Sequence, residues 1–553
     1  MEININTPKF EQQNKKYNYN NQQTFTGLAD NTTALLRFLD TNQAIGANCV
    51  DLGSMVIPRT TVDFINRGPD AGTETARRES MGTINHSSVG LYGTFAGLMI
   101  AAGLNNKYGI KAHKIFADNH TIDTIAQSWH DAQKASDPLK EHVKTFVNSI
   151  RVLNTDTEKT TGHISIPEKD KQEIIDALYN QLKNSKDQTI DKDFAKSMHA
   201  MITASTGGEK TVYLLSKDNK EAQNTLKTLI SNFYNTTKAF STGKAVEAFK
   251  NSADVNGNEL VKALKKMNIT RSAIGLGIAT AIGVSTQPIN MYLTKKKTGK
   301  DGFVGVEGRE KDNSSEFKMM KTIGALIFAG GALATITTNP KKFLSKIQFQ
   351  GMLPTIDQLK LVYGMTIASR LLAARDKDEL RESAVKDSLG FLNLLILGSL
   401  VTKGAARGLD KTLVNETVSK GKSWFGKFAD SSLKTRDEVL LPLLKKNGIN
   451  VVKDGKAVPF KDLMKEVSKL NPDEQKAIKK KLRALNIAQI VGYLYSGLVL
   501  GVGIPKLNIY MTNKSEAKRK AKLAQAKADN ANPVFSSENQ DFLKSKYKSF
   551  ISA

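Results

Sequence analysis

The most polar neighbourhood beside an apolar stretch of this chain is Arg77-Arg78-Glu79, which is followed by Asn85 and His86. A histidine or carboxylate at membrane depth is costly, and where it occurs it is typical of a proton relay or a ligand site. The same pattern is also typical of a helix that starts in water, with its ions solvated and His86 at the boundary. We favour this second interpretation. We likewise place Asp51 on the polar side of an interfacial or core helix.

Motifs for catalysis or metal binding are absent from the sequence. The seven histidines have no metal-ligand spacing, and His113 and His120 would lie two helical turns apart. The segment Gly207–Thr211 lacks the spacing of a phosphate-binding loop, and Gly275-Leu276-Gly277 lacks the third glycine of a dinucleotide fingerprint. Cys49 is the single cysteine, which excludes a disulfide within the chain. We therefore expect no catalytic, cofactor or metal site, although these absences do not exclude a new kind of enzyme.

Six apolar stretches would form the framework around any site. A helix that crosses a membrane needs about 20 mostly apolar residues. Four stretches reach that length, a fifth is short, and a sixth is interrupted by Arg370. Long uncharged runs are unusual in soluble helices, so they favour membrane insertion over the alternative of buried helices in a large soluble protein. In that order the stretches are Ser80–Asn106, Ser272–Thr294, Thr322–Pro340, Ala484–Pro505, Ser388–Thr402 and Leu361–Ala374.

Small residues recur at helical spacing within these stretches. A helix face that lacks bulk lets a neighbouring backbone approach closely, which is typical of helix packing in membranes. Glycine is also costly in a helix exposed to water. We therefore predict close helix packing at Gly93, Gly97, Gly275, Ala279, Gly283, Gly497 and Gly501.

The ends of two stretches resemble each other. Aligned on Asn290 and Asn508, both read Asn-x-Tyr-x-Thr-x-Lys, and Gly283 then aligns with Gly501. Tyrosine suits a membrane interface because its ring is apolar and its hydroxyl is polar. Asn290, Tyr292, Asn508 and Tyr510 are therefore predicted interface anchors. The echo indicates either an internal duplication or a pattern that any membrane exit would share, and both remain open.

The chain carries 80 lysines and arginines against 54 acids, a formal charge of +26. This excess favours anionic partners, either lipid headgroups or nucleic acid. Basic clusters adjoin three of the long stretches, which predicts that these ends face the cytoplasm. The region Lys403–Arg483 has 20 basic and 10 acidic residues and would then lie outside, so the topology stays open. The predicted lipid-headgroup contacts are Lys295, Lys296, Lys297, Lys514, Lys518, Arg519, Lys520 and Lys522.

These observations predict an all-α, multi-span helical membrane protein with polar helical inserts between the spans. Its specific activity is open; an organising, anchoring or transport-associated role fits, with a bilayer of anionic lipids as partner and a homo-oligomer as an option. The alternative is a soluble, basic helical protein that binds nucleic acid or scaffolds partners. The expected segments are a disordered tail (1–32), an interfacial segment with the first span (33–104), a polar helical domain (105–271), membrane helices (272–402), a basic helical region (403–483), the last span (484–513) and a basic tail (514–553).

Overall fold

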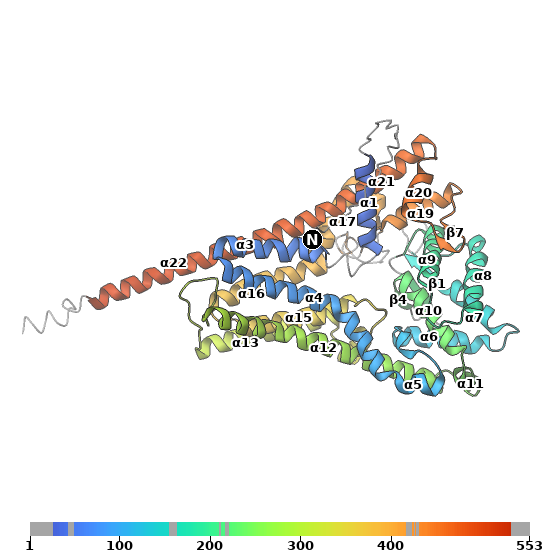
Figure 1. Ribbon diagram of the computed structural model, residues 1–553, viewed down its shortest axis with the longest axis horizontal. Helices are drawn as coiled ribbons and strands as arrows, with labels where there is room; N and C mark the ends of the chain where they lie inside the picture. The colour runs from blue at the N-terminus through green and yellow to red at the C-terminus, as the bar shows by residue number, and fades with distance from the viewer. Residues whose placement is uncertain are drawn as a thin grey trace, which may run out of the picture.

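A computed structural model describes residues 26–41, 49–153, 163–209, 212–215, 221–415 and 431–531, together with residues 423, 424, 426 and 428. The described chain is mostly helical, as the sequence predicts. Long helices lie side by side along the longest axis of the molecule, and shorter helices gather at one end of them (Figure 1). The expected tail 1–32 falls largely outside the described residues, and helix α1 (Thr26–Thr41) begins within it.

One antiparallel helix pair is formed by α4 (Pro69–Ile100) and α12 (Glu259–Thr298). The Asn290 side chain donates to the Glu74 carbonyl near one end of the pair, at 2.9 Å. At the other end, a side chain added at Gly97 would meet the Arg271 guanidinium. Between them, the backbone of Gly93 lies against Gly275, where an added Cβ would be 2.9 Å from the Gly93 Cα. Glycine at both positions permits this approach of the two backbones.

A second antiparallel pair is assembled from shorter pieces. Its first member is a continuous helix made of α16 (Lys377–Leu392), a π-helical turn (Asn393–Leu397) and α17 (Gly398–Leu409). Its second member is a continuous helix made of α21 (Pro472–Tyr495), a π-helical turn (Ser496–Gly503) and α22 (Ile504–Ala531). The Asn508 side chain donates to the Glu382 carbonyl, and Gly492 lies against Thr402 further along. Figure 1 shows α22, in red, projecting beyond the other helices.

Shorter helices complete the framework, which we refer to as the bundle. Helix α3 (Ile57–Arg67) precedes α4 and α15 (Ile356–Ala373) precedes α16, so each pair begins with a helical hairpin. A π-helical turn (Leu52–Val56) leads into α3. Helix α13 (Ser315–Ile336) packs against α15, and α14 (Pro340–Lys346) connects the two. The first pair and the second pair are thus joined through α13–α15.

A polar domain is inserted between α4 and α12. Its hydrophobic core is continuous from Tyr108 to Met267 and includes Trp129, Phe146 and Phe233. A four-stranded antiparallel sheet in the order β2-β1-β3-β4 closes one side. The helices are α5 (Ala102–Tyr108), α6 (Asn119–Ala132), α7 (Pro138–Ser149), α8 (Glu168–Asn184), α9 (Lys192–Thr206), α10 (Leu226–Phe240) and α11 (Lys244–Lys250), and the strands are β1 (Ile150–Leu153), β2 (His163–Ser165), β3 (Val212–Leu215) and β4 (Glu221–Asn224).

A smaller insert lies between α17 and α21. It contains α19 (Arg436–Lys446), α20 (Phe460–Val467) and two short hairpins, β5 (Val414–Asn415) with β6 (Ser432–Leu433), and β7 (Val452–Lys453) with β8 (Lys456–Ala457). Leu440, Leu463 and Leu485 lie in one hydrophobic cluster, so this insert packs on the end of α21. Helix α9 packs against α19, which brings the two inserts together at the same end of the bundle (Figure 1).

Three helices of the described chain have the length and apolarity needed to cross a membrane: α12, α13 and the continuous helix from Pro472 to Ala528. Helices α4 and α5, bent by 53° at their junction, meet this standard only as a pair. The stretches around α15 and α17 do not reach it. The surface of the bundle is nevertheless rich in large apolar side chains. Those more than half exposed include Leu91, Phe95 and Leu98 on α4, Leu326 and Ile327 on α13, and Leu494 and Leu498 on the last helix.

Candidate functional site

The first helix of each pair carries the same sequence pattern. Asn290 binds the Glu74 carbonyl and Asn508 binds the Glu382 carbonyl, so we align Glu74 with Glu382. Pro69 then aligns with Lys377, and no gap is needed as far as Thr94 and Thr402. Within this register the paired charges are also alike, because Arg78 aligns with Lys386 and Glu79 with Asp387. The identical pairs are Asp70/Asp378, Glu74/Glu382, Ala76/Ala384, Ser80/Ser388, Gly82/Gly390, Asn85/Asn393, Gly90/Gly398 and Thr94/Thr402.

The second helix of each pair repeats as well. The alignment of Asn290 with Asn508 extends back to Glu259 without a gap. It adds the identical pairs Lys262/Lys480, Leu264/Leu482, Asn268/Asn486, Ile269/Ile487, Leu276/Leu494 and Val284/Val502 to those of the Asn-x-Tyr-x-Thr-x-Lys motif. The echo at the ends is therefore part of a longer repeated pattern, and we refer to each helix pair, with the helix before it, as a unit. Its signal in the first helix was missed because charges and small residues, rather than apolar ones, carry it.

The two units exchange ion pairs reciprocally. Arg67 from the end of α3 binds both carboxylate oxygens of Glu382 on α16. Arg375, which aligns with Arg67, binds both carboxylate oxygens of Glu74 on α4, at 2.5 and 3.3 Å. Since Glu74 also aligns with Glu382, each unit gives an arginine to the same glutamate of the other. Subunits related by a two-fold axis make contacts of this kind.

A second layer of charges lies next to these pairs. Glu79 accepts hydrogen bonds from Lys386 at 3.0 Å and from Arg59 at 3.2 Å. Asp387 forms an ion pair with Arg370 at 3.0 Å. A buried ion pair persists only where geometry and further hydrogen bonds offset the loss of hydration. We refer to the two layers together as the ionic centre: Arg59, Asp63, Arg67, Glu74, Arg78, Glu79, Arg370, Arg375, Glu379, Glu382, Lys386 and Asp387.

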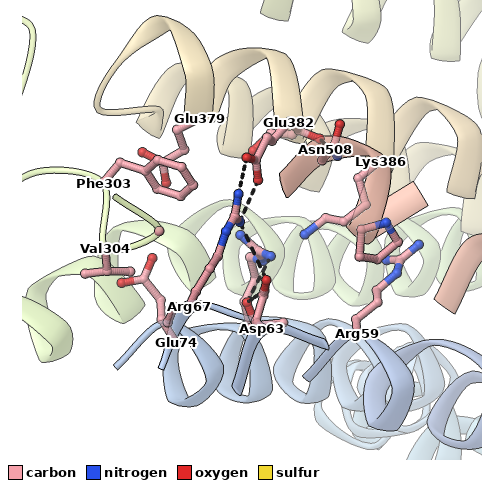
Figure 2. A pocket seen from close by; sticks show the side chains of 16 residues that line it. Arg59, Asp63, Arg67, Glu74, Phe303, Val304, Glu379, Glu382, Lys386 and Asn508 are labelled. Carbon is pink, nitrogen blue, oxygen red and sulfur yellow. Dashed lines mark hydrogen bonds and ion pairs between the residues drawn. The ribbon is translucent and has the colours of Figure 1, made fainter. Parts of the chain in front are cut away.

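Figure 2 shows the ionic centre between α3 and α4 below and α16 above, with the loop at Phe303 and Val304 closing one side. Arg67 spans the gap and reaches Glu382, while Asp63 lies beside it on its own helix. The free volume among these side chains is only about 30 Å³. This is room for a water or two at most, so side chains close the passage between the units at this level.

A much larger cavity of about 770 Å³ lies next to the ionic centre, toward the two inserts. Both units line it. The first contributes Arg59, Glu79, Thr83 and His86, and the second contributes Tyr363, Arg370, Lys386 and Asp387. Further lining residues lie along α17 to Lys403, and from Gln489 of α21 to Ser496 at the start of the π-helical turn. Glu382 of the ionic centre lies on α16, which precedes α17, so the cavity is displaced from the ionic centre along the bundle.

The expectation that Arg78, Glu79 and His86 mark a solvated helix start is wrong. Their exposed fractions are 9%, 7% and 7%. Arg59 of α3 and Lys386 of α16 bind Glu79. The His86 ring stacks on Tyr363 with 3.5 Å between ring centroids. Among the described side chains, neither His86 nitrogen has a hydrogen-bond partner. A run of charges looks alike in water and in a buried network, because only tertiary packing decides which one it joins.

The predicted packing residues lie mostly at helix crossings. Gly93 and Gly97 face α12, Gly283 lies against Thr366 of α15, and Ala279 accepts a hydrogen bond from Asn85 through its carbonyl. Gly501 lies against the Ser54 carbonyl, whereas a Cβ added at Gly497 would be 3.9 Å from its nearest neighbour, an ordinary contact.

The predicted interface anchors divide into two kinds. Asn290 and Asn508 are buried within the pairs, while Tyr292 and Tyr510 are each 63% exposed. The predicted headgroup residues Lys295, Lys296, Lys297, Lys514, Lys518, Lys520 and Lys522 are exposed, and Arg519 is half-buried. They extend beyond the ionic centre at the end of the bundle away from the inserts.

A second polar cluster lies where the inserts meet. His199 of α9 is 2.5 Å from Glu209, and their ligand atoms lie within 4.8 Å of those of Asp437 on α19. Arg37 of α1 occupies both Asp437 oxygens, at 2.5 and 3.1 Å, which disfavours a metal ion at this carboxylate. Burial alone would lower the pKa of His199, but the charge and hydrogen bond of Glu209, with Asp437, raise it above 6.5. The cluster is therefore a histidine–carboxylate pair of the first insert that lies against Asp437 of the second.

No protein-family model matches the chain, and no curated protein or solved structure matches it either.

Proposed function

We propose that this chain is a multi-span membrane protein with a transport-associated role, in which two repeated units enclose a polar cavity. The observation that carries the proposal is the cavity itself, lined by charged side chains of both units. Ionisable groups inside a bundle with an apolar surface are typical of substrate and ion pathways. Repeated units with a site between them are typical of transporters.

The apolar surface of the bundle supports membrane insertion. Leu326, Ile327 and Leu498 are between 65% and 70% exposed, which would be unfavourable in water over so many neighbouring side chains. The alternative of a soluble, nucleic-acid-binding protein leaves this surface without a partner. The basic clusters around Lys296 and Lys518 lie at one end only, where anionic headgroups would attract them.

The ionic centre has the properties of a closed gate. It lies between the cavity and the basic end of the bundle, and its own free volume is about 30 Å³. The Arg67–Glu382 and Arg375–Glu74 pairs join the two units at this level. Separation of the units would break both pairs together, so these pairs would hold the cavity shut on the basic side.

Membrane insertion is tested by alkaline carbonate extraction of the full-length chain. The wild type should remain in the pellet, and release into the soluble fraction would refute the proposal. Leu498→Arg should impair insertion, because a central arginine costs about 2.5–3.5 kcal/mol on the insertion scale. Leu498→Ile is the matched control and should behave as the wild type.

The gate is tested by thiol labelling in proteoliposomes. In a Cys49→Ser background, Ser87→Cys places a thiol on the cavity wall, and Val89→Cys places one in the fully buried core of the same helix. An impermeant maleimide should label Ser87→Cys from the face of the inserts only. Adding Glu382→Gln should admit labelling from the basic face as well, while Val89→Cys stays unlabelled. Equal labelling of Ser87→Cys from both faces without Glu382→Gln would contradict a closed gate.

A further inference from the structure

The charges beside the cavity are not balanced. The layer of the ionic centre that adjoins it contains four cations, Arg59, Arg78, Arg370 and Lys386. They face three carboxylates, because Asp51 of the cavity wall adds to Glu79 and Asp387. The layer further from the cavity has an excess of negative charge. In it, Arg67 and Arg375 face four carboxylates, which belong to Asp63, Glu74, Glu379 and Glu382. The positive side of the ionic centre therefore faces the cavity.

Several donors at this deep end have no partner among the residues that the structure describes. Arg59 uses two of its nitrogens on Glu79 and on the Leu500 carbonyl, and within that part of the chain its Nη2 is buried without a hydrogen bond. This nitrogen would be 3.7 Å from a Cβ at Gly390, which lines the cavity. Arg370 binds Asp387 and the Arg78 carbonyl, and its Nε is likewise buried and unpartnered. An unmade hydrogen bond at a buried charged group costs free energy, which a bound anion would recover.

His86 adds a third group at the same place. Its ring is 7% exposed, lines the cavity, and has no hydrogen-bond partner among the described residues at either nitrogen. A neutral imidazole still carries one N–H donor. Its stacking on Tyr363 fixes the plane of the ring, so the direction of that donor is set before a ligand arrives.

The remaining wall of the cavity is largely apolar. It includes Val56, Leu353, Ile356, Leu359, Ile367 and Phe391. A volume of about 770 Å³ lies within the usual range for pockets that hold small organic ligands. A polar end with an excess of cations and an apolar wall suit a molecule that has both parts.

From this arrangement we infer that the cavity binds an organic anion, with one carboxylate or phosphate group on an apolar body. The anionic group would lie between Arg59, Arg370 and His86, and the apolar body along Leu353 and Ile367. This inference deepens the proposed transport role and rests on it, since it names the class of molecule that the cavity accepts. Such an anion could come from the aqueous phase or from the bilayer, and the two sources differ in the body that carries the charge.

The test is a binding titration on the full-length chain in phosphatidylcholine nanodiscs, with empty nanodiscs subtracted. 4-Phenylbutyrate represents a soluble organic anion, laurate represents a lipid-derived one, 4-phenylbutanol lacks the charge, and acetate lacks the body. At least one of the first two should bind saturably at one site. The other two should bind about tenfold more weakly or not at all, as expected for the loss of a charged hydrogen bond or of apolar contact. Tighter laurate binding would assign the bilayer as the source, and tighter phenylbutyrate binding the aqueous phase.

Two variants connect binding to the cavity. Arg59→Gln removes the unpartnered Nη2 and should weaken anion binding about tenfold. Because Arg59→Gln also removes a partner of Glu79, Gly390→Leu serves as a second variant that keeps every charge and fills the cavity beside Arg59. Gly390→Leu should abolish binding, whereas Gly277→Leu, in open space on α12, should not change it.

The inference is overturned if 4-phenylbutanol binds as tightly as 4-phenylbutyrate, if none of the probes binds, or if Gly390→Leu binds as the wild type does. These outcomes are distinct from failure of the proposed function. A chain that resists carbonate and passes the thiol-labelling test, but binds none of the probes, keeps its transport role and loses the ligand class. A chain that carbonate releases loses both.

Discussion

Arg375 and Glu74 lie 301 residues apart in the sequence, yet the guanidinium of one donates two hydrogen bonds to the carboxylate of the other. Arg67 and Glu382, which align with them in the repeat, make the same contact in the opposite direction. The two units are therefore held together by pairs that neither could form by itself. This relationship explains why one chain needs two copies of the unit to close the ionic centre.

Breaking one of these pairs should be strongly destabilising. Both Arg375 and Glu74 are almost fully buried, so Glu74→Gln leaves a buried guanidinium with one carboxylate fewer. Loss of one partner in a buried pair typically costs about 3–5 kcal/mol. Thermal unfolding of the purified protein should show a clearly lower midpoint for Glu74→Gln. The double exchange Glu74→Arg with Arg375→Glu should recover part of the loss, and no recovery would argue against a direct coupling of the two residues.

The contact between α4 and α12 depends on the absence of side chains at Gly93 and Gly275. Gly275→Leu should separate the helices, because even a Cβ there would be 2.9 Å from Gly93 and 3.2 Å from the Phe349 ring. The folded yield after size-exclusion chromatography should fall sharply. Gly277→Leu, on the open side of the same helix, is the matched control. If both variants give the wild-type yield, the close approach of the two helices is not required.

The contact between the two inserts should weaken as the pH rises. Unfolded His199 titrates near its ordinary pKa of 6.5, and Glu209 and Asp437 raise its pKa in the folded chain despite burial. Its contribution to stability is therefore complete below pH 6.5 and is lost as the pH passes through the raised pKa. Lys227 opposes the shift, and Arg37 forms an ion pair with Asp437.

Hydrogen exchange measures this effect directly. Amides of α9 and α19 should exchange faster at pH 9 than at pH 6 after correction for the intrinsic rate, while those in the middle of α12 should not change. His199→Gln should remove the difference because it removes the titrating group. A pH dependence that survives in His199→Gln would assign the effect to another residue.

The basic end of α22 should bind anionic lipid. Lys514, Lys518, Lys520 and Lys522 are exposed on a continuous helix, and each can contribute about 1 kcal/mol near headgroups. A peptide of residues 514–527 should bind vesicles that contain phosphatidylserine, and the binding should weaken with salt. Vesicles of phosphatidylcholine should bind it negligibly. Equal binding to both kinds of vesicle would show that charge is not the cause.

The sequence by itself predicted a mostly helical chain and the register of the repeat in the second helix of each pair. Periodic apolar residues and cap residues such as Asn258 and Asn471 act within one or two turns, so a local pattern suffices to predict helices. The Asn-x-Tyr-x-Thr-x-Lys motif could be recognised for the same reason, because its residues are close together in the sequence. Of the small sheet β1–β4, only the run that forms β3 is strand-like in the sequence. The strands are short, and β1 pairs with β3 across the segment that holds α8 and α9.

The tertiary structure alone decided which charges became a site. By sequence, Arg78, Glu79 and His86 are compatible with a solvated helix start, and only the packing of α3, α15 and α16 buries them. Arg67 and Arg375 stand in stretches too polar to be recognised as parts of the bundle, and their partners lie about three hundred residues away. Whether a charged side chain is buried or paired depends on how the helices pack against one another. A charge shows no sign of its partner in its own sequence neighbourhood, so only the packing of the two units could reveal the ionic centre and the cavity beside it.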